Sequence, residues 1–246
     1  DDFARVPRNG KIAMKLNDGD GRQIDSLVNV LLHHEDDHIA LYTANGQAIR
    51  FPASDVRVFS SRASTGVRGI RLRNQDQVIS AAVLRDAGAE AGEPAAYLAR
   101  AAQERQQDRG VGDDETVETM TDARYQQLRA LEEFVLSVTD RGFGKRTSSF
   151  AYRVTARGGI GVQDKARVKS IGNQVGCSVV RPDQEVVLIT DAGRVIRIPA
   201  ETIRVTGRGA KGVRLFDIDD SERIVSYAIV DPDESLDQDE PETETA

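Results

Sequence analysis

The sequence predicts an all-β protein built from propeller-like blades of four strands, with a helical insertion and a disordered acidic tail. A β-rich hairpin occurs three times, and each hairpin is followed by a turn of the form Gly-x-x-Gly-Ile/Val. The glycines of the second and third hairpin turns, Gly142 and Gly193, lie 51 residues apart. Four strands in about 50 residues are typical of the blades of β-propellers.

The hairpins occupy residues 39–51, 134–147 and 186–198. Each contains an apolar run, a polar turn with glycine, and a second run that carries arginine four residues after the glycine. The first turn is Asn45-Gly46, which favours a two-residue hairpin because both residues tolerate positive φ. We therefore expect three antiparallel hairpins in related positions.

A glycine-rich turn follows each hairpin, at 65–72, 157–162 and 208–215. Arginine and lysine flank the paired glycines of these turns. Two glycines three residues apart predict a place where the backbone bends sharply or approaches another group closely. The apolar runs at 77–84 and 223–230 then predict one more strand in each of their repeats.

The insertion explains an irregular spacing. Gly46 and Gly142 lie 96 residues apart, and the excess over one repeat corresponds to residues 86–133. Pro94 marks the start of one stretch of helix-forming residues, and 122–133 form a second. We read this insertion as an addition to the repeated pattern.

The chain is thereby divided into four parts. Residues 1–85 hold the end of one blade and the first full repeat, 86–133 form the insertion, 134–230 hold two further repeats, and 231–246 form the acidic tail. Residues 8–16 resemble the end of a repeat, so we expect the chain to begin within a repeat and to be a fragment of a longer array. Three blades are too few to close a propeller.

Charge is distributed unevenly around a net value of −7. The insertion holds 12 acidic and five basic residues, and the tail holds eight acidic and no basic residues, which leaves a body with 28 basic and 20 acidic residues. A basic body predicts a polyanionic partner. The acidic tail has two interpretations: it only keeps the chain soluble and is disordered, or it competes with that partner for the basic body. Because only 5% of the residues are aromatic, base stacking on single strands is disfavoured.

Other functional classes find little support. We expect no membrane contact, because the sequence lacks a long apolar run and a signal-peptide pattern. The single cysteine excludes an internal disulfide and fits a reducing, cytoplasmic location. We expect Cys177 to be a buried core residue and the stretch containing His33, His34 and His38 to be an exposed loop without a metal. No nucleophile is paired with a base, so we assign no catalytic residue and expect no cofactor.

The repeated motifs resemble those of a known family. Residues 46–51 with 65–72, then 142–147 and 207–213, are similar to the C-terminal domain of the DNA gyrase A subunit. This resemblance implies a β-pinwheel, a propeller-like ring that wraps duplex DNA around a basic rim and so supports ATP-dependent negative supercoiling by the holoenzyme. The resemblance also implies two protein partners: the gyrase B subunit and the remainder of the gyrase A subunit.

The resemblance is incomplete in one motif. The family's heptapeptide Gln-Arg-Arg-Gly-Gly-Lys-Gly is absent, and residues 157–161 and 208–212 resemble degenerate versions of it, which predicts roughly the last three blades. The catalytic tyrosine and the ATPase modules lie outside such a domain. Two alternatives are the matching domain of topoisomerase IV and a propeller that serves as a protein-interaction platform. A continuous basic rim would favour DNA, whereas an apolar patch would favour a protein partner.

Wrapping requires cations along a curved phosphate path more than it requires reading of bases. Cations at strand edges can also act only to prevent edge pairing and to keep the surface soluble. Their recurrence at matched positions favours DNA. The predicted phosphate contacts are Arg50, Arg62 and Arg68 in the first repeat, Lys145, Arg146, Arg153 and Arg157 in the second, and Arg197, Arg204, Arg208 and Lys211 in the third.

Overall fold

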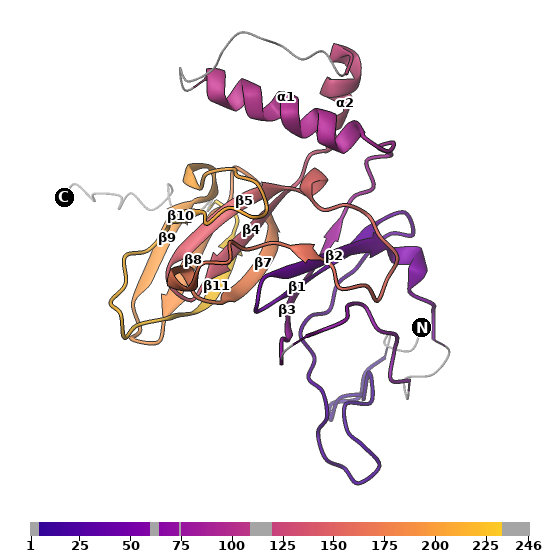
Figure 1. The fold of residues 1–246 in the computed structure, drawn as a ribbon. Helices are drawn as coiled ribbons and strands as arrows, with labels where there is room; N and C mark the ends of the chain where they lie inside the picture. Colours follow the sequence, from indigo (N-terminus) through magenta and orange to yellow (C-terminus); the bar gives the residue numbers. More distant parts are fainter. Residues whose placement is uncertain (1–4, 60–63, 74, 109–119, 233–246) are drawn as a thin grey trace, which may run out of the picture.

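Three antiparallel sheets stand side by side in the computed structural model, which describes residues 5–59, 64–73, 75–108 and 120–232 (Figure 1). The strand orders are β3-β1-β2-β6, β10-β5-β4-β7 and β11-β8-β9. We call these sheets the first, second and third blade. Their strands are β1 (His38–Thr43), β2 (Gln47–Pro52), β3 (Val78–Leu84), β4 (Phe134–Thr139), β5 (Phe143–Ser148), β6 (Val162–Gln163), β7 (Gln174–Val180), β8 (Glu185–Thr190), β9 (Val195–Pro199), β10 (Val213–Arg214) and β11 (Ile224–Val230).

The three hairpins share one turn. In the first blade the carbonyl oxygen of Thr43 accepts a hydrogen bond from the Gly46 amide at 2.9 Å, and Thr43 Oγ1 accepts one from the next amide at 3.0 Å. Thr139 and Thr190 make the same two contacts in the other blades. The glycine alone has positive φ, +83° at Gly46, so the turn is a three-residue loop that ends in a left-handed glycine. This differs from the two-residue turn predicted for Asn45-Gly46.

The glycine-rich turns cross between blades. The sequence places each turn within its own repeat, but β6 of the second repeat pairs with β2 of the first blade, and β10 of the third repeat pairs with β5 of the second blade. Gly161 and Gly212 make this exchange possible. A Cβ atom there would lie 2.3 Å from the carbonyl oxygen of Ala48 and 2.4 Å from that of Gly144. The first and second blades are therefore each completed by the repeat that follows them.

In the part of the chain that the structure describes, the third blade has three strands. Nowhere in the described ranges does a strand pair with the outer edge of β9. The side chains of β9 are partly or fully exposed, and Val195 is 62% exposed.

The inner strands hold the blades together, because β3 packs against β7 and β7 against β11. Between the first two blades, the rings of Tyr42 and Tyr152 meet edge to face at 5.7 Å beside Cys177. Leu136 and Leu188 belong to the core between the second and third blades. Cys177 is buried as predicted, and burial raises the pKa of its thiol.

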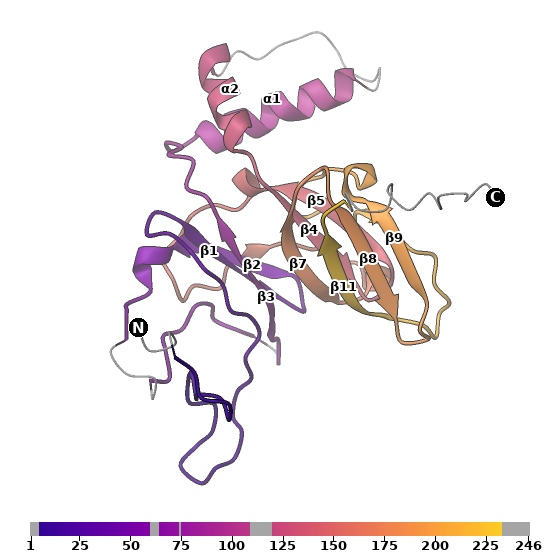
Figure 2. The ribbon, with the colours of Figure 1, turned by 180° about the vertical axis from the view of Figure 1, so that it is seen from behind.

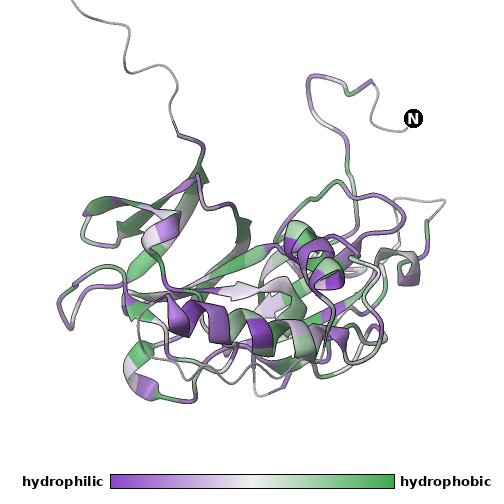
Figure 3. Ribbon diagram, turned by 90° about the horizontal axis from the view of Figure 1, so that it is seen from above, coloured by the Kyte–Doolittle hydropathy of each residue, from purple (hydrophilic) through white to green (hydrophobic). Residues whose placement is uncertain are grey.

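The insertion forms two helices, α1 (Glu93–Gln107) and α2 (Asp122–Leu131), above the ends of the strands (Figures 1 and 2). Pro94 lies in the first turn of α1, where its missing amide hydrogen costs nothing. Seen from above, α1 carries both hydrophilic and hydrophobic residues (Figure 3). No helix within the described residues is long and apolar enough to cross a membrane. The acidic tail predicted for 231–246 lies outside these residues from 233 onward.

Candidate nucleic-acid interface

Arg50 and Arg146 occupy matched positions on β2 and β5 and are buried, with exposed fractions of 5% and 8%. Arg146 donates hydrogen bonds to the carbonyl oxygens of Ile203 at 2.7 Å and Glu201 at 2.9 Å in the third repeat. Arg50 donates to the carbonyl oxygen of Ser149 in the second repeat at 3.0 Å. Burial lowers the pKa of both guanidinium groups. Each arginine therefore fastens its own blade to the next.

Lys145 is also buried, with 3% exposed. Its Nζ donates hydrogen bonds to the carbonyl oxygens of Asp164 at 2.7 Å and Gly207 at 3.3 Å, and also to that of Arg208. Desolvation lowers the pKa of this ammonium group. We therefore revise the predicted phosphate contacts. Lys145, like Arg50 and Arg146, is used inside the protein and cannot reach a phosphate in this structure.

The recurrent arginines of the glycine-rich turns have a structural use as well. Arg157 Nη1 donates to the carbonyl oxygen of Arg68 at 2.6 Å, and Arg208 Nη1 donates to that of Gln163 at 2.7 Å. Each turn is thus tied to the turn of the preceding repeat. Their recurrence has a cause other than DNA or solubility, and the sequence alone did not show it.

The other predicted cations that the structure describes lie at the surface. Arg197 is exposed and pairs with Glu185. The Nζ of Lys211 lies 4.4 Å from the ring centre of Phe143. Arg62 lies outside the described residues. The predicted cations that are exposed and make no ion pair with another described residue are Arg68, Arg153, Arg204 and Lys211.

A groove at the hairpin-turn end of the first two blades gathers further cations. Two adjoining cavities of about 500 and 490 Å³ share Asn45, Gln47, Gln163 and Arg167. We call them together the basic groove. Four exposed cations line the basic groove, namely Arg71, Arg73, Arg167 and Lys169. None of them has an ion-pair partner within the described ranges.

The carboxylates of the basic groove are bound to the backbone. Asp76 Oδ1 accepts a hydrogen bond from the Asn45 amide at 2.9 Å, and Asp140 Oδ1 accepts one from the Asn173 amide at 3.0 Å. These acids hold turns in place, and the cations face solvent. The alternation of basic residues at 165, 167 and 169 is the sequence signal that could have revealed this site.

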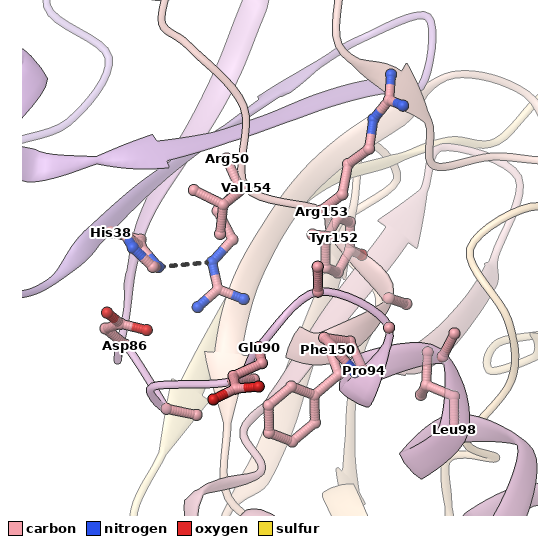
Figure 4. A pocket seen from close by; sticks show the side chains of 16 residues that line it. His38, Arg50, Asp86, Glu90, Pro94, Leu98, Phe150, Tyr152, Arg153 and Val154 are labelled. Carbon is pink, nitrogen blue, oxygen red and sulfur yellow. Dashed lines mark hydrogen bonds between the residues drawn. The ribbon is translucent and has the colours of Figure 1, made fainter. Parts of the chain in front are cut away.

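His38 corrects the prediction of an exposed histidine loop. It is the first residue of β1 and only 6% exposed, whereas His33 and His34 are exposed. His38 Nδ1 accepts a hydrogen bond from Arg50 Nε at 3.1 Å (Figure 4). Burial, and then the nearby Arg50 charge, lower the pKa of His38. The described residues include no group of three or more His, Cys, Asp or Glu side chains placed to hold a metal.

Comparison with known proteins gives the same assignment as the motifs. A family model described as "DNA gyrase C-terminal domain, beta-propeller" matches residues 1–22, 37–85, 133–167 and 184–231. The chain belongs to this family. The model leaves residues 86–132 unmatched, and these contain α1 and α2.

Two relatives show how much of a longer protein this domain represents. The DNA gyrase A subunit of Rickettsia bellii is 40% identical over 99% of this chain, and that of Granulibacter bethesdensis is 41% identical over 96%. In both cases the match spans 26% of the relative. The chain therefore spans about a quarter of the length of the curated relatives that it matches.

Solved structures confirm the predicted β-pinwheel fold. A DNA gyrase A C-terminal domain superposes with a TM-score of 0.63 at 20% identity, covering 91% of this chain and 59% of that one. The C-terminal domain of a DNA topoisomerase IV superposes with a TM-score of 0.61 at 20% identity, covering 83% of this chain and 50% of that one. At this identity the likeness establishes the fold alone.

Proposed function

We propose that the chain binds duplex DNA without sequence specificity and wraps it along the outer edges of its blades. As the C-terminal domain of a gyrase A subunit, working with the gyrase B subunit, it would support ATP-dependent negative supercoiling. The observation that carries the proposal is the basic groove, where exposed cations without ion-pair partners among the described residues line the junction of two consecutive blades.

The groove suits phosphate contact. Arg71 lies in the glycine-rich turn of the first repeat, and its amide donates a hydrogen bond to the carbonyl oxygen of Gly159 in the next turn at 2.7 Å. Paired turns therefore set cations of successive repeats beside one another. Each phosphate neutralised on duplex DNA contributes about 0.9 to the slope of log affinity against log salt. The four exposed cations of the groove correspond to a slope of about 3.6.

The chemistry of the site favours a double-stranded partner. Tyr42, Tyr97, Tyr125 and Tyr152 are buried, so these rings cannot stack on unpaired bases. Arginine and lysine beside backbone turns contact phosphate and carry no base preference of their own. Gyrase is preferred to topoisomerase IV because relatives 40% and 41% identical are both DNA gyrase A subunits.

The test compares two labelled duplexes of unrelated sequence with a matched single strand, over a salt series. We expect equal affinity for the duplexes, weaker binding to the single strand, and a linear fall of log affinity with log salt. Wrapping is then measured as the linking-number change that the chain leaves in circular DNA relaxed by a nicking-closing topoisomerase. Failure to bind at low salt, or binding that salt does not weaken, would refute the proposal.

A further inference from the structure

The loops that lead into β7 and β11 occupy matched positions at the two blade junctions. In each case the first residue of the strand donates its amide hydrogen to the hairpin turn of the preceding blade, and the last residue of the loop accepts a hydrogen bond from the hairpin turn of its own blade. The four bonds, of 2.9 to 3.0 Å, are Gln174 to Ala44, Asp140 to Asn173, Ile224 to Asp140 and Asp191 to Arg223. Each loop therefore lies at the hairpin-turn end of its junction.

The two loops carry opposite charge. Residues 164–173 include three basic residues and one acidic residue, whereas residues 215–223 include four acidic residues and one basic residue. Lys169 and Asp220 lie at the same place, each eight residues after the second glycine of its Gly-x-x-Gly turn. A cation of the basic groove is thus replaced by a carboxylate in the next repeat. We call residues 217–222 the acidic loop.

The acidic loop neutralises cations of its own repeat. Asp217 forms a hydrogen-bonded ion pair with Arg214, and Glu222 pairs with Arg194 at 2.7 Å. Lys169 of the preceding loop has no such partner within the described ranges. The second junction therefore presents paired arginines and exposed carboxylates to a duplex, whereas the first junction presents exposed cations.

The acidic loop also borders the basic groove. Arg141 and Arg223 line one of the two cavities of the groove, and both donate hydrogen bonds to the carbonyl oxygen of Asp220, at 2.8 and 2.5 Å. The Nη1 atom of Arg141 also lies 3.8 Å from Oδ1 of Asp220. Asp219 and Asp220 are exposed. Since exposed charges interact over about 8 Å at physiological salt, these carboxylates repel phosphate at this edge of the groove.

We propose that the acidic loop ends the DNA path at the hairpin-turn end of the domain, so that phosphates are bound at the junction of the first two blades and kept from the junction of the second and third. The inference rests on the proposed function, because it concerns the same DNA path. It makes the number of phosphates held at this end depend on the charge of one loop in each repeat.

The first test locates DNA on the two matched loops of the full chain. Ser170 and Ser221 are both exposed, and each lies nine residues after its turn glycine. Because Cys177 is buried, Ser170→Cys and Ser221→Cys can each carry a maleimide-linked photocrosslinker at a single site. With the aspartates intact, we expect duplex DNA to crosslink through residue 170 and not through residue 221.

The second test removes the charge of the acidic loop and keeps the shape of its side chains. The acidic-loop variant carries asparagine at the three exposed aspartates, Asp217, Asp219 and Asp220. It should crosslink through both probe sites. Release of Arg141 and Arg214 for two more phosphates should raise the salt slope of duplex binding by about 1.8, since each phosphate contributes about 0.9. Replacing both arginines by alanine should abolish this gain and leave the slope unchanged when the aspartates are intact.

A matched control makes the same change in charge at the opposite ends of the strands of the third blade. Asp183→Asn, Glu185→Gln and Asp231→Asn remove the ion-pair partners of Arg181 and Arg197. This variant should bind with the wild-type slope and crosslink as the wild type does. An equal gain in the control would show an effect of net charge alone and would overturn the inference.

The remaining outcomes separate this inference from the proposed function. A wild-type chain that does not bind duplex DNA refutes the function itself. A chain that binds, and that crosslinks equally through residues 170 and 221 with its aspartates intact, overturns the boundary alone. This outcome does not depend on whether the acidic-loop variant folds.

Discussion

The matched arginines of the second and third blades allow a quantitative test of how the blades are joined. Arg146→Met keeps the apolar stem and removes the two hydrogen bonds, at 2.7 and 2.9 Å, to the carbonyl oxygens of Ile203 and Glu201. Hydrogen bonds from a charged group contribute about 1.5–3 kcal/mol each. Since removing the buried charge also relieves its desolvation, we expect a net loss of about 2–4 kcal/mol in the free energy of unfolding.

Arg197→Met is the matched control. Arg197 occupies the same position on β9, but its side chain is 41% exposed and pairs with Glu185 at the surface. Exposed ion pairs contribute about 0–1 kcal/mol, so this variant should unfold nearly as the wild type does. Urea unfolding followed by tyrosine fluorescence suits both variants, because the chain has no tryptophan. Equal losses in the two variants, or a loss below about 1 kcal/mol at Arg146, would refute the idea that buried arginines join the blades.

Three further predictions concern the insertion, the strand exchange and the core. Hydrogen bonds from Arg124 and from a backbone amide lower the pKa of Glu93 to about 2. Its contribution to stability should be present above about pH 4.5 and be lost as the pH falls toward 2, so near-ultraviolet circular dichroism should show the insertion loosening in that window, less so in Glu93→Gln. Gly161→Ala should destabilise the chain by more than about 1 kcal/mol and by more than Gly193→Ala. Both glycines have positive φ, but only at Gly161 would the added Cβ collide with a carbonyl oxygen, that of Ala48. Cys177 should react with a thiol reagent only at the rate of unfolding, and fast labelling of the native protein would contradict its burial.

Local patterns predicted the elements of the fold well. The apolar run at 77–84 contains β3, and Pro94 marks the start of α1. Strand alternation and turn residues act over a few positions, so they can be read from one sequence. The exchange of β6 and β10 between blades could not be predicted in this way, because the residues of a Gly-x-x-Gly turn do not determine which sheet the following strand joins. The glycines predicted a close approach, and only the structure identified the carbonyl oxygens that they approach.

The site was harder to predict than the fold. Counting cations at matched positions cannot distinguish Arg146, which joins two blades, from Arg204, which faces solvent. These cations recur because the blades themselves repeat. The basic groove was missed because Arg71 and Lys169 are distant in sequence and line adjoining cavities only after β6 has joined the first blade.

The most direct test of the central claim is the salt dependence of duplex binding when Arg71, Arg73, Arg167 and Lys169 are all replaced by alanine. The control variant replaces Arg181 and Arg197, which are held by surface ion pairs with Asp183 and Glu185. If the basic groove holds the phosphates, the slope of log affinity against log salt falls by about 3.6 in the groove variant and stays near the wild-type value in the control. A folded groove variant with an unchanged slope would contradict the claim.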